Sequence, residues 1–165
     1  MIKEATELIA PITENISERL TERPQWVCWC LEEREGKPTK IPYVPSTDRR
    51  ASSIDLMTWA TFSEASAAYE AGKPLAYDGL GFAFCSADPF VGIDLDDCRD
   101  PDSGEISQWA QEIIDSVQEG YVEVSPSGHG IHIIVEGVLR GGGMRKGKVE
   151  MYSRERFFTI TGRCL

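Results

Sequence analysis

The segment over residues 90–96, Phe-Val-Gly-Ile-Asp-Leu-Asp, constrains the fold more than any other part of the chain. Side chains of a β-strand alternate between its two faces. The apolar side chains at every second position of the segment are Val91, Ile93 and Leu95. We therefore predict a strand that buries this face in a core and directs Asp94 and Asp96 to the opposite face.

Other segments rich in β-branched and aromatic residues predict the rest of the sheet. These segments are 25–32, 40–44, 81–85, 121–125, 131–136, 149–152 and 156–161. We expect segments 81–85 and 90–96 to pair as a hairpin, because the turn signal Ala87-Asp88-Pro89 lies between them. The polar segment 45–55 and the glycine-rich basic segment 137–148 are predicted to be loops.

Three helices are predicted. The first covers residues 4–20, with an interruption near Pro11. The second begins after Thr61, because Thr61 and Glu64 match a capping box, and it ends at Gly72. The third covers residues 105–118 and is amphipathic. Strands that alternate with a few helices predict an α/β or α+β fold around a mixed or antiparallel sheet.

Composition and charge limit the classes of protein that the chain can represent. It has 165 residues, of which 41% are hydrophobic and 27% charged, as expected for one globular domain. With 27 acidic and 17 basic residues, its net charge of −10 excludes a wholly basic nucleic-acid-binding surface. Segment 139–165 contains seven basic and two acidic residues, and we interpret it as a local anion site rather than an accidental cluster. No apolar run reaches the ~18–20 residues of a membrane span, and the N-terminus lacks the features of a signal peptide.

Asp94 and Asp96 form the first motif with chemical potential. Two carboxylates on one face of a strand, ~6.5–7 Å apart, repel each other unless a cation or a proton lies between them. Oxygen donors of this kind suit Mg²⁺ or Mn²⁺. The pair alone is weak evidence, because a strand that ends in an acidic turn also explains it.

A turn that contains Ser127, Gly128 and His132 forms the second motif. The sequence from 125 to 132, Ser-Pro-Ser-Gly-His-Gly-Ile-His, places two glycines between two predicted strands. Glycines allow a backbone to approach a ligand closely, and hydroxyl and main-chain N–H groups suit phosphate oxygens. His132 can donate to the same anion. A hairpin turn with one structural histidine is the alternative interpretation.

Glu150 and Tyr152 belong to the third motif. On a strand over 149–152 they share the face opposite to Val149 and Met151. This adds a third carboxylate beside the basic segment, although a single strand glutamate is often only a solvated edge residue. Carboxylates that hold metal ions, together with basic and hydroxyl groups for phosphates, are what two-metal nucleotidyl transfer requires.

The three motifs in this order resemble the primase-polymerases of the archaeo-eukaryotic primase superfamily. The resemblance is closest to the branch carried by phages, plasmids and other mobile elements. It is strong from about Gly79 to Gly162, where it ends in Arg-Phe-Phe-Thr-Ile-Thr-Gly, and weaker before that. It implies a primase core with an N-terminal α/β half over 1–79 and a C-terminal half over 80–165 that is similar to an RNA-recognition motif, within one catalytic domain over 1–165.

The resemblance also implies roles for individual residues. The residues implied to bind two divalent metal ions, Mg²⁺ or Mn²⁺, are Asp94, Asp96 and Glu150. His132 is implied to act in catalysis with them, and Ser127, Gly128 and His132 to contact the phosphates of the incoming nucleotide. Further contacts to triphosphate or template phosphates are implied for Lys148, Arg154 and Arg156. Tyr152 is implied to lie near the nucleotide sugar.

The same resemblance implies the partners. They are a DNA template and primer, dNTPs or NTPs, and a downstream helical domain and a helicase that the 165 residues do not contain. It implies no membrane partner and a cytoplasmic place in prokaryotic or viral replication. The expected activity is template-dependent nucleotidyl transfer by a DNA primase or DNA polymerase.

Other enzyme classes fit the sequence poorly. A serine hydrolase would use Ser127, which is not part of a Gly-x-Ser-x-Gly elbow. Segment 142–148 has the glycine spacing of a P-loop, but Val149 stands where Ser or Thr should bind magnesium. A rolling-circle initiator needs a His-x-His pair, which His129 and His132 do not form. The main alternative is a non-catalytic nucleotide- or nucleic-acid-binding domain derived from a primase-polymerase.

Overall fold

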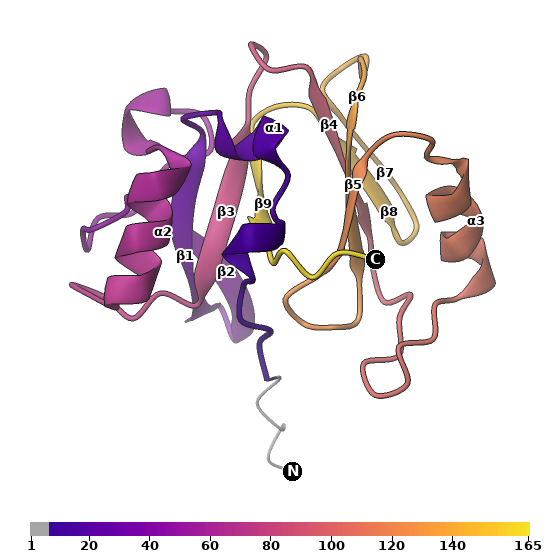
Figure 1. The fold of residues 1–165 in the computed structure, drawn as a ribbon, viewed down its shortest axis with the longest axis horizontal. Coiled ribbons are helices and arrows are strands. Elements are labelled where there is room, and N and C mark those ends of the chain that lie inside the picture. The colour runs from indigo at the N-terminus through magenta and orange to yellow at the C-terminus, as the bar shows by residue number, and fades with distance from the viewer. Residues whose placement is uncertain (1–6) are drawn as a thin grey trace.

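A computed structural model describes residues 7–165 of the chain, which form two antiparallel β-sheets and a few short helices (Figure 1). The strands of the first sheet are β1 (Trp26–Arg34), β2 (Lys37–Tyr43), β3 (Gly79–Phe84) and β9 (Arg156–Ile160). The strands of the second sheet are β4 (Phe90–Leu95), β5 (Tyr121–Val124), β6 (Ile131–Glu136), β7 (Gly143–Lys146) and β8 (Val149–Tyr152). The helices are α1 (Glu18–Thr21), α2 (Phe62–Ala71) and α3 (Gln108–Ser116), with 3-10 turns η1 (Thr13–Asn15) and η2 (Leu56–Thr58).

The strand order is β2-β1-β3-β9 in the first sheet and β5-β6-β4-β8-β7 in the second. This arrangement confirms the predicted α+β class with antiparallel pairing. Strand β9, from the end of the chain, pairs with β3 and so joins the first sheet. The division into halves at about residue 80 stays a prediction.

Helix α2 covers the first sheet, as its sequence predicts. The Thr61 hydroxyl accepts from the main-chain N–H of Glu64 at 3.2 Å, and the Glu64 carboxylate accepts from the N–H of Thr61 at 2.9 Å. The helix ends at Gly72, which has a φ of 61° and the left-handed conformation of a C-terminal cap. Ala65 and Ala68 on its inner face are buried, so two small side chains allow the helix to pack closely on the sheet.

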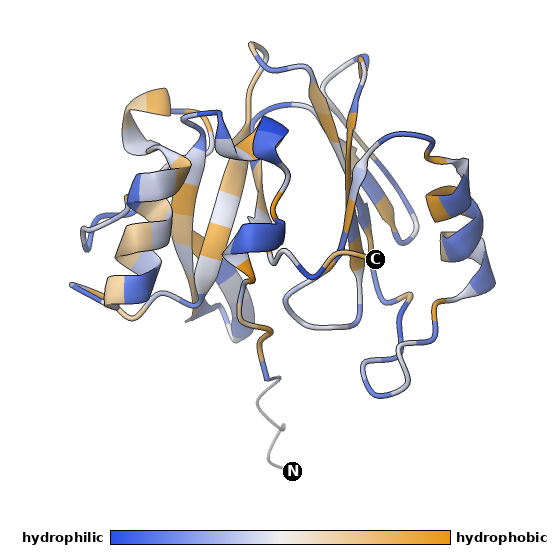
Figure 2. Ribbon diagram, in the orientation of Figure 1, coloured by the Kyte–Doolittle hydropathy of each residue, from blue (hydrophilic) through white to orange (hydrophobic). Residues whose placement is uncertain are grey.

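Helix α3 covers one face of the second sheet. The side chains of Val91, Ile93 and Leu95 are buried in one cluster with Ala110 of α3, which confirms the predicted core face of β4. Figure 2 shows hydrophobic residues concentrated in the strands, while much of α3 is hydrophilic. Because strand side chains alternate, Asp94 lies on the face of β4 that α3 does not cover.

The two sheets meet at Gly92 in the middle of β4. A methyl group on Gly92 would lie 2.7 Å from the Phe158 ring and 2.7 Å from the Phe84 ring. Both rings are buried, and they pack edge to face with centroids 5.0 Å apart. The glycine therefore lets aromatic side chains of the first sheet approach the backbone of the second sheet.

Replacing Gly92 with alanine is expected to lower the free energy of unfolding by ~1–3 kcal/mol, because the two aromatic rings have no free space to move into. Urea denaturation of Gly92→Ala and of the wild type measures this difference. Gly137→Ala is the matched control, because its methyl group would meet its nearest atom at an ordinary 3.8 Å. Equal stability of both variants would contradict the close approach at Gly92.

The predicted hairpin between segments 81–85 and 90–96 is wrong. Strand β3 pairs with β1 and β9, whereas β4 pairs with β6 and β8 in the other sheet. The turn signal itself is real, since the Asp88 carboxylate accepts from the main-chain N–H groups of Cys85 and Phe90 at 2.9 and 2.8 Å. It reverses the chain, but pairing depends on strands that arrive from distant parts of the sequence.

The predicted helix over 4–20 is also wrong where the structure describes it, and residues 4–6 lie outside the described part. The main-chain N–H of Ile9 donates to the carbonyl of Pro126 at 2.8 Å, and that of Ile12 to the carbonyl of Thr161 at 2.7 Å. Pro11 has no N–H and disfavours helical backbone before it. The backbone therefore bonds to distant segments, and helical turns form only at 13–15 and 18–21.

Strand β7 lies inside the segment 137–148 that was predicted to be a loop. All four of its residues are exposed, and it pairs only with β8, across a turn at Gly147 with a φ of 61°. An exposed edge strand has no buried face, so its sequence lacks the apolar alternation that reveals β4. Within residues 7–165, no helix has the length and apolar character needed to cross a membrane.

Candidate active site

Five ionisable side chains form one row across the second sheet. Each is the direct cross-strand partner of the next, in the order Glu123 of β5, His132 of β6, Asp94 of β4, Glu150 of β8 and Arg145 of β7. Directly opposed residues have side chains within contact distance in antiparallel sheets. The register thus brings together three predicted site residues that lie up to 56 positions apart in the sequence, Asp94, His132 and Glu150.

His132 is buried in this row, with a relative exposure of 4%. Its Nδ1 lies 3.3 Å from Oε1 of Glu123, and its Nε2 lies 3.7 Å from Oδ1 of Asp94. The Phe158 ring packs against the imidazole with centroids 5.1 Å apart. The ring is therefore held between two carboxylates and an aromatic side chain of the other sheet.

Asp96 follows directly after β4 and adds a carboxylate near Asp94 and Glu150 of the row. Its main-chain N–H donates to the carbonyl of Lys148 at 2.8 Å, which continues the pairing of β4 with β8. Burial raises the pKa of Asp96, and the charges of Asp94 and Glu150 raise it further. Asp94 and Glu150 thus lie close enough to Asp96 for their charges to disfavour its charged form.

Glu150 has two polar neighbours on its own side of the sheet. The Tyr152 hydroxyl donates to Oε2 of Glu150 at 2.5 Å, and Nη1 of Arg145 lies 3.1 Å from Oε1. The hydrogen bond to Glu150 raises the pKa of Tyr152, so the phenol stays a donor. The guanidinium of Arg156 lies over the Tyr152 ring at 4.9 Å. Tyr152 therefore lies beside Glu150 and Arg156 beside Tyr152, and their contacts with the nucleotide stay a prediction.

The chemistry of the carboxylate group fits a divalent metal ion. Hard oxygen donors that repel one another are the ligands that Mg²⁺ and Mn²⁺ prefer, and a cation would relieve the repulsion that contributes to the raised pKa of Asp96. Within residues 7–165, however, no three His, Cys, Asp or Glu side chains are already arranged to ligate one ion. Glu150 is instead directed to Arg145 and Tyr152.

The serine-rich turn connects the end of β5 to the start of β6 and is separate from the carboxylates. Gly128 has a φ of 77°, and the hydroxyl of Ser127 accepts from the main-chain N–H of His129 at 3.3 Å. Ser127 and Gly128 line a broad groove of about 1200 Å³ together with Arg99 and Arg163. In the described part of the chain, no hydrogen bond joins Ser127 or Gly128 to the carboxylates.

Two of the predicted basic contacts are directed elsewhere. Nζ of Lys148 donates to Oδ2 of Asp97 at 2.9 Å, which lowers the pKa of Asp97. Arg154 is exposed and packs over Gly142, where a methyl group would lie 2.5 Å from its Nε. Among the described residues, neither side chain forms a hydrogen bond with a carboxylate of the row, and their phosphate contacts stay a prediction.

Sequence reasoning missed three residues near the site. Glu123 and Arg145 end the row on opposite edges of the sheet. Lys40 of β2 belongs to the first sheet, and the charges of Asp94 and Asp96 act on its ammonium group against the burial that lowers its pKa. Glu123 could have been found, because a glutamate within the largely apolar segment 121–125 is unusual and suggests a buried charge. No sequence pattern pointed to Lys40.

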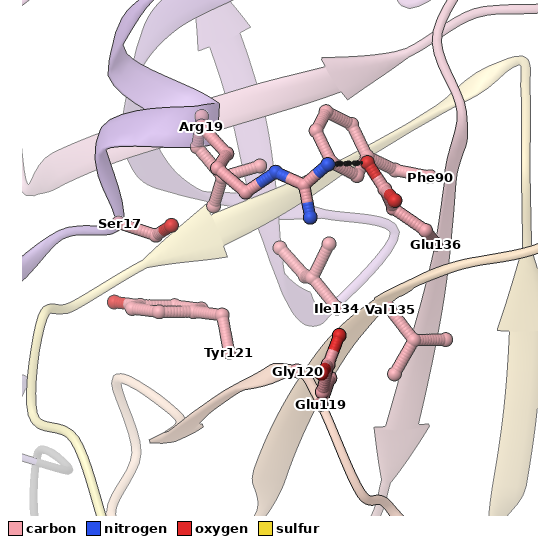
Figure 3. A pocket seen from close by; sticks show the side chains of 10 residues that line it. Ser17, Arg19, Phe90, Glu119, Gly120, Tyr121, Ile134, Val135 and Glu136 are labelled. Atoms are coloured by element: carbon pink, nitrogen blue, oxygen red, sulfur yellow. Dashed lines mark hydrogen bonds and ion pairs between the residues drawn. The ribbon is translucent and has the colours of Figure 1, made fainter.

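A second cavity lies away from this row. A pocket of about 540 Å³ is found near the start of β4 and the end of β6, where Phe90 and Glu136 are opposed. Figure 3 shows Arg19 reaching across it to Glu136, with Tyr121 in its wall. None of the predicted site residues lines this pocket.

One comparison with known proteins shows the family of the chain. No family model matches the chain. Over 149 residues it is 36% identical to a DNA primase-polymerase of Nitratiruptor phage NrS-1, and the aligned part covers 87% of this chain. The chain therefore contains a primase-polymerase-type domain of a phage branch. This domain corresponds to 20% of the length of its relative, so activity, substrates and partners are matters for proposal.

Repulsion between the carboxylates of the primase-polymerase-type domain is expected to lower its free energy of unfolding in the absence of metal ions. Asp96→Asn is expected to raise the free energy of unfolding at about pH 7 by at most ~1 kcal/mol, because Asp96 is exposed enough for water to screen its charge. The raised pKa means that the folded protein binds this proton more tightly than the unfolded chain does. Protonation of Asp96 therefore stabilises the folded wild type. This stabilisation is complete below the ordinary pKa of 3.8 and is lost as the pH rises through the pKa of Asp96 in the folded protein.

Urea denaturation of both proteins in the presence of a chelator, at about pH 7 and about pH 4, measures this effect. The advantage of the asparagine variant should shrink toward the lower pH, since the wild-type carboxyl is then protonated. An advantage that grows on acidification, or a variant that is less stable at neutral pH, would contradict the proposed repulsion.

Proposed function

We propose that the domain is a template-dependent nucleotidyltransferase that acts as a primase or DNA polymerase in replication. The 3′-hydroxyl of a primer, or of an initiating nucleotide, attacks the α-phosphate of a nucleoside triphosphate, and pyrophosphate leaves. The observation that carries the proposal is the direct opposition of Asp94 and Glu150 on β4 and β8, with Asp96 beside them. The 36% identity to a phage DNA primase-polymerase supports it.

Asp94, Asp96 and Glu150 would hold two divalent ions, Mg²⁺ or Mn²⁺. When bound, such ions supply Lewis-acid stabilisation of the attacking and leaving oxygens. For Glu150 to serve as a ligand, its carboxylate has to leave Arg145, to which it lies 3.1 Å away. The arginine is then free to interact with another anion, and a triphosphate is the anion that the proposed reaction brings.

The remaining predicted residues would bind and orient the substrates. His132 directs Nε2 toward Asp94, at 3.7 Å, and would donate to a phosphate oxygen when Nε2 carries a proton. Ser127 and Gly128 offer a hydroxyl and a main-chain turn to the phosphates, while Lys148, Arg154 and Arg156 supply positive charge. Tyr152, directed to Glu150 by its hydroxyl, would lie against the nucleotide sugar.

DNA template, primer and nucleotides are the proposed partners, and a helical domain and a helicase are proposed to act with the domain. A cytoplasmic replication setting remains an expectation from the resemblance. Duplex binding requires several contacts between basic residues and phosphates, and the net charge of this chain is −10. Template binding is therefore the part of the function that most needs a partner domain.

A non-catalytic binding domain is the second candidate. The ion pair between Arg145 and Glu150 favours it, because it occupies one of the three carboxylates. Such a domain would bind nucleotide and metal without forming a bond. The presence of all three carboxylates on adjacent strands favours the catalytic proposal.

Primer extension on a labelled primer-template separates the two candidates. The reaction is run with Mg²⁺ or Mn²⁺ and with dNTPs or NTPs, for the wild type and for Asp94→Ala/Asp96→Ala. Metal-dependent extension that is lost in the double variant would support the transferase and reveal its sugar preference. Metal-dependent triphosphate binding without extension would favour the binding domain, and absence of both would overturn the site assignment.

A further inference from the structure

Glu123 is a buried carboxylate at one end of the row, and the function proposed above does not use it. Its side chain has a relative exposure of 0%. It accepts hydrogen bonds from the Tyr121 hydroxyl at 2.5 Å and from the main-chain N–H groups of Thr161 and Gly162 at 2.9 and 2.8 Å, all at Oε2. These donors account for the stability of a buried negative charge at this position.

The second oxygen of Glu123 is directed to the imidazole. Oε1 lies 3.3 Å from Nδ1 of His132 and 3.1 Å from the N–H of Thr161. A carboxylate only accepts hydrogen bonds, so Nδ1 of His132 has to carry a proton in this contact. Burial and the adjacent Glu123 charge raise the pKa of Tyr121, which keeps the phenol a donor and leaves the imidazole contact undisturbed.

The contact between Nδ1 and Glu123 also fixes the position of Nε2, on the opposite side of the imidazole. With Nδ1 on Glu123 and the Phe158 ring packed 5.1 Å away, Nε2 lies 3.7 Å from Oδ1 of Asp94. A ring flip would put the carbon Cδ2 in the place of Nδ1 and would break the contact with the buried Glu123 carboxylate. Glu123 thus determines that Nε2, rather than a ring carbon, is the atom of His132 next to Asp94.

We propose that Glu123 is a positioning residue that holds His132 with Nδ1 protonated toward the interior and Nε2 toward Asp94 and the incoming phosphate. The part of this inference that concerns the phosphate rests on the proposed function, whereas the orientation of the ring does not. The competing explanation is that Glu123 serves only to anchor the main chain at Thr161 and Gly162 after β9.

Nitrogen-15 NMR of the histidine rings distinguishes these explanations. The chain has only two histidines, His129 and His132, and His129 is exposed, so it serves as an internal control. The variant is Glu123→Gln, which keeps one oxygen for the main-chain N–H groups but turns an amide NH₂ toward Nδ1. We expect a proton on Nδ1 of His132 in the wild type and a ring protonated only at Nε2 in the variant, with His129 unchanged.

Amide exchange at Thr161 and Gly162 tests the competing explanation in the same samples. Protection that persists in Glu123→Gln while the His132 signals change supports positioning of the ring. An unprotonated Nδ1 in the wild type, or a His132 signature that the variant leaves unchanged, overturns the proposal. Neither outcome depends on catalysis, so a domain without polymerase activity would refute the proposed function and leave this inference intact.

The functional consequence is measured by single-nucleotide incorporation. Loss of an outer partner of a metal-ligating histidine typically costs about 10- to 100-fold, and we expect an effect of the same order for a phosphate-binding histidine. The KM for the incoming nucleotide should rise by this factor in Glu123→Gln, with a smaller change in kcat. The reason is that a ring protonated only at Nε2 is neutral, whereas the Glu123 carboxylate allows His132 to carry a proton on both nitrogens and to bind the phosphate as a cation. An unchanged KM in a variant whose ring has switched would overturn the link between Glu123 and phosphate binding.

Discussion

Replacement of Asp94 by alanine is expected to reduce nucleotide incorporation by at least ~1000-fold, because metal ions supply several kcal/mol of transition-state stabilisation and each 1.4 kcal/mol is a factor of ten. Asp94 is the central carboxylate of the row, opposite Glu150 on one side and His132 on the other. Under the proposed function its loss removes an oxygen ligand between two other site residues, so Asp96 and Glu150 cannot compensate for it.

The fold should tolerate this change. The Asp94 side chain is partly exposed and accepts no hydrogen bond from the main chain among the described residues. Single-turnover primer extension measures the effect, and circular dichroism with urea denaturation checks the fold. Asp115→Ala on α3 is the matched control, because α3 covers the opposite face of the sheet. Substantial extension by folded Asp94→Ala would exclude Asp94 as a metal ligand.

The faces of individual strands were predictable from the sequence, and that prediction gave most of the site. Alternation along β4 and β8 placed Asp94 and Glu150 on the face opposite to Ile93 and Met151, and in the structure Ile93 is buried and Met151 partly buried in the cluster that includes Ala110 of α3. Period-two alternation is a local property of strand backbone, so it survives whichever strands become neighbours.

Register was not predictable in the same way. The row from Glu123 to Arg145 exists because β5, β6, β4, β8 and β7 align with particular cross-strand partners. A shift of one residue in any pair would move a charged side chain to the core face. The buried apolar side chains of both partners decide the register, and one sequence read locally does not reveal which segments meet.

The wrong hairpin has the same origin. Asp88 organises the turn after β3 through bonds to Cys85 and Phe90, which is a local signal that the sequence contains. The chain crosses to another sheet at this turn, because β9 takes the free edge of β3 and β6 and β8 enclose β4. Because residue 92 is a glycine, the rings of Phe84 and Phe158 can pack against it between the sheets. No local sequence pattern predicts this contact.

Replacement of Glu123 by alanine should cause the largest loss of stability among single changes in the row. It removes the acceptor for the Tyr121 hydroxyl, for the N–H groups of Thr161 and Gly162, and for His132. Each buried donor left without a partner costs about 1–3 kcal/mol, so a decrease of at least ~4 kcal/mol in the free energy of unfolding is expected. That is a large part of the ~5–15 kcal/mol that stabilises a typical domain.

Urea denaturation of Glu123→Ala, Glu123→Gln and Glu136→Ala measures the difference. Glu136 pairs with Arg19 at the surface, where an ion pair contributes about 0–1 kcal/mol, so its loss calibrates the removal of an exposed carboxylate. Glutamine at 123 should recover part of the stability, because it retains an acceptor for the main-chain donors and fills the same volume. If alanine at 123 costs no more than alanine at 136, the carboxylate does not hold the end of β9 against the second sheet. The orientation of His132 would then have to depend on Phe158 and Asp94 alone.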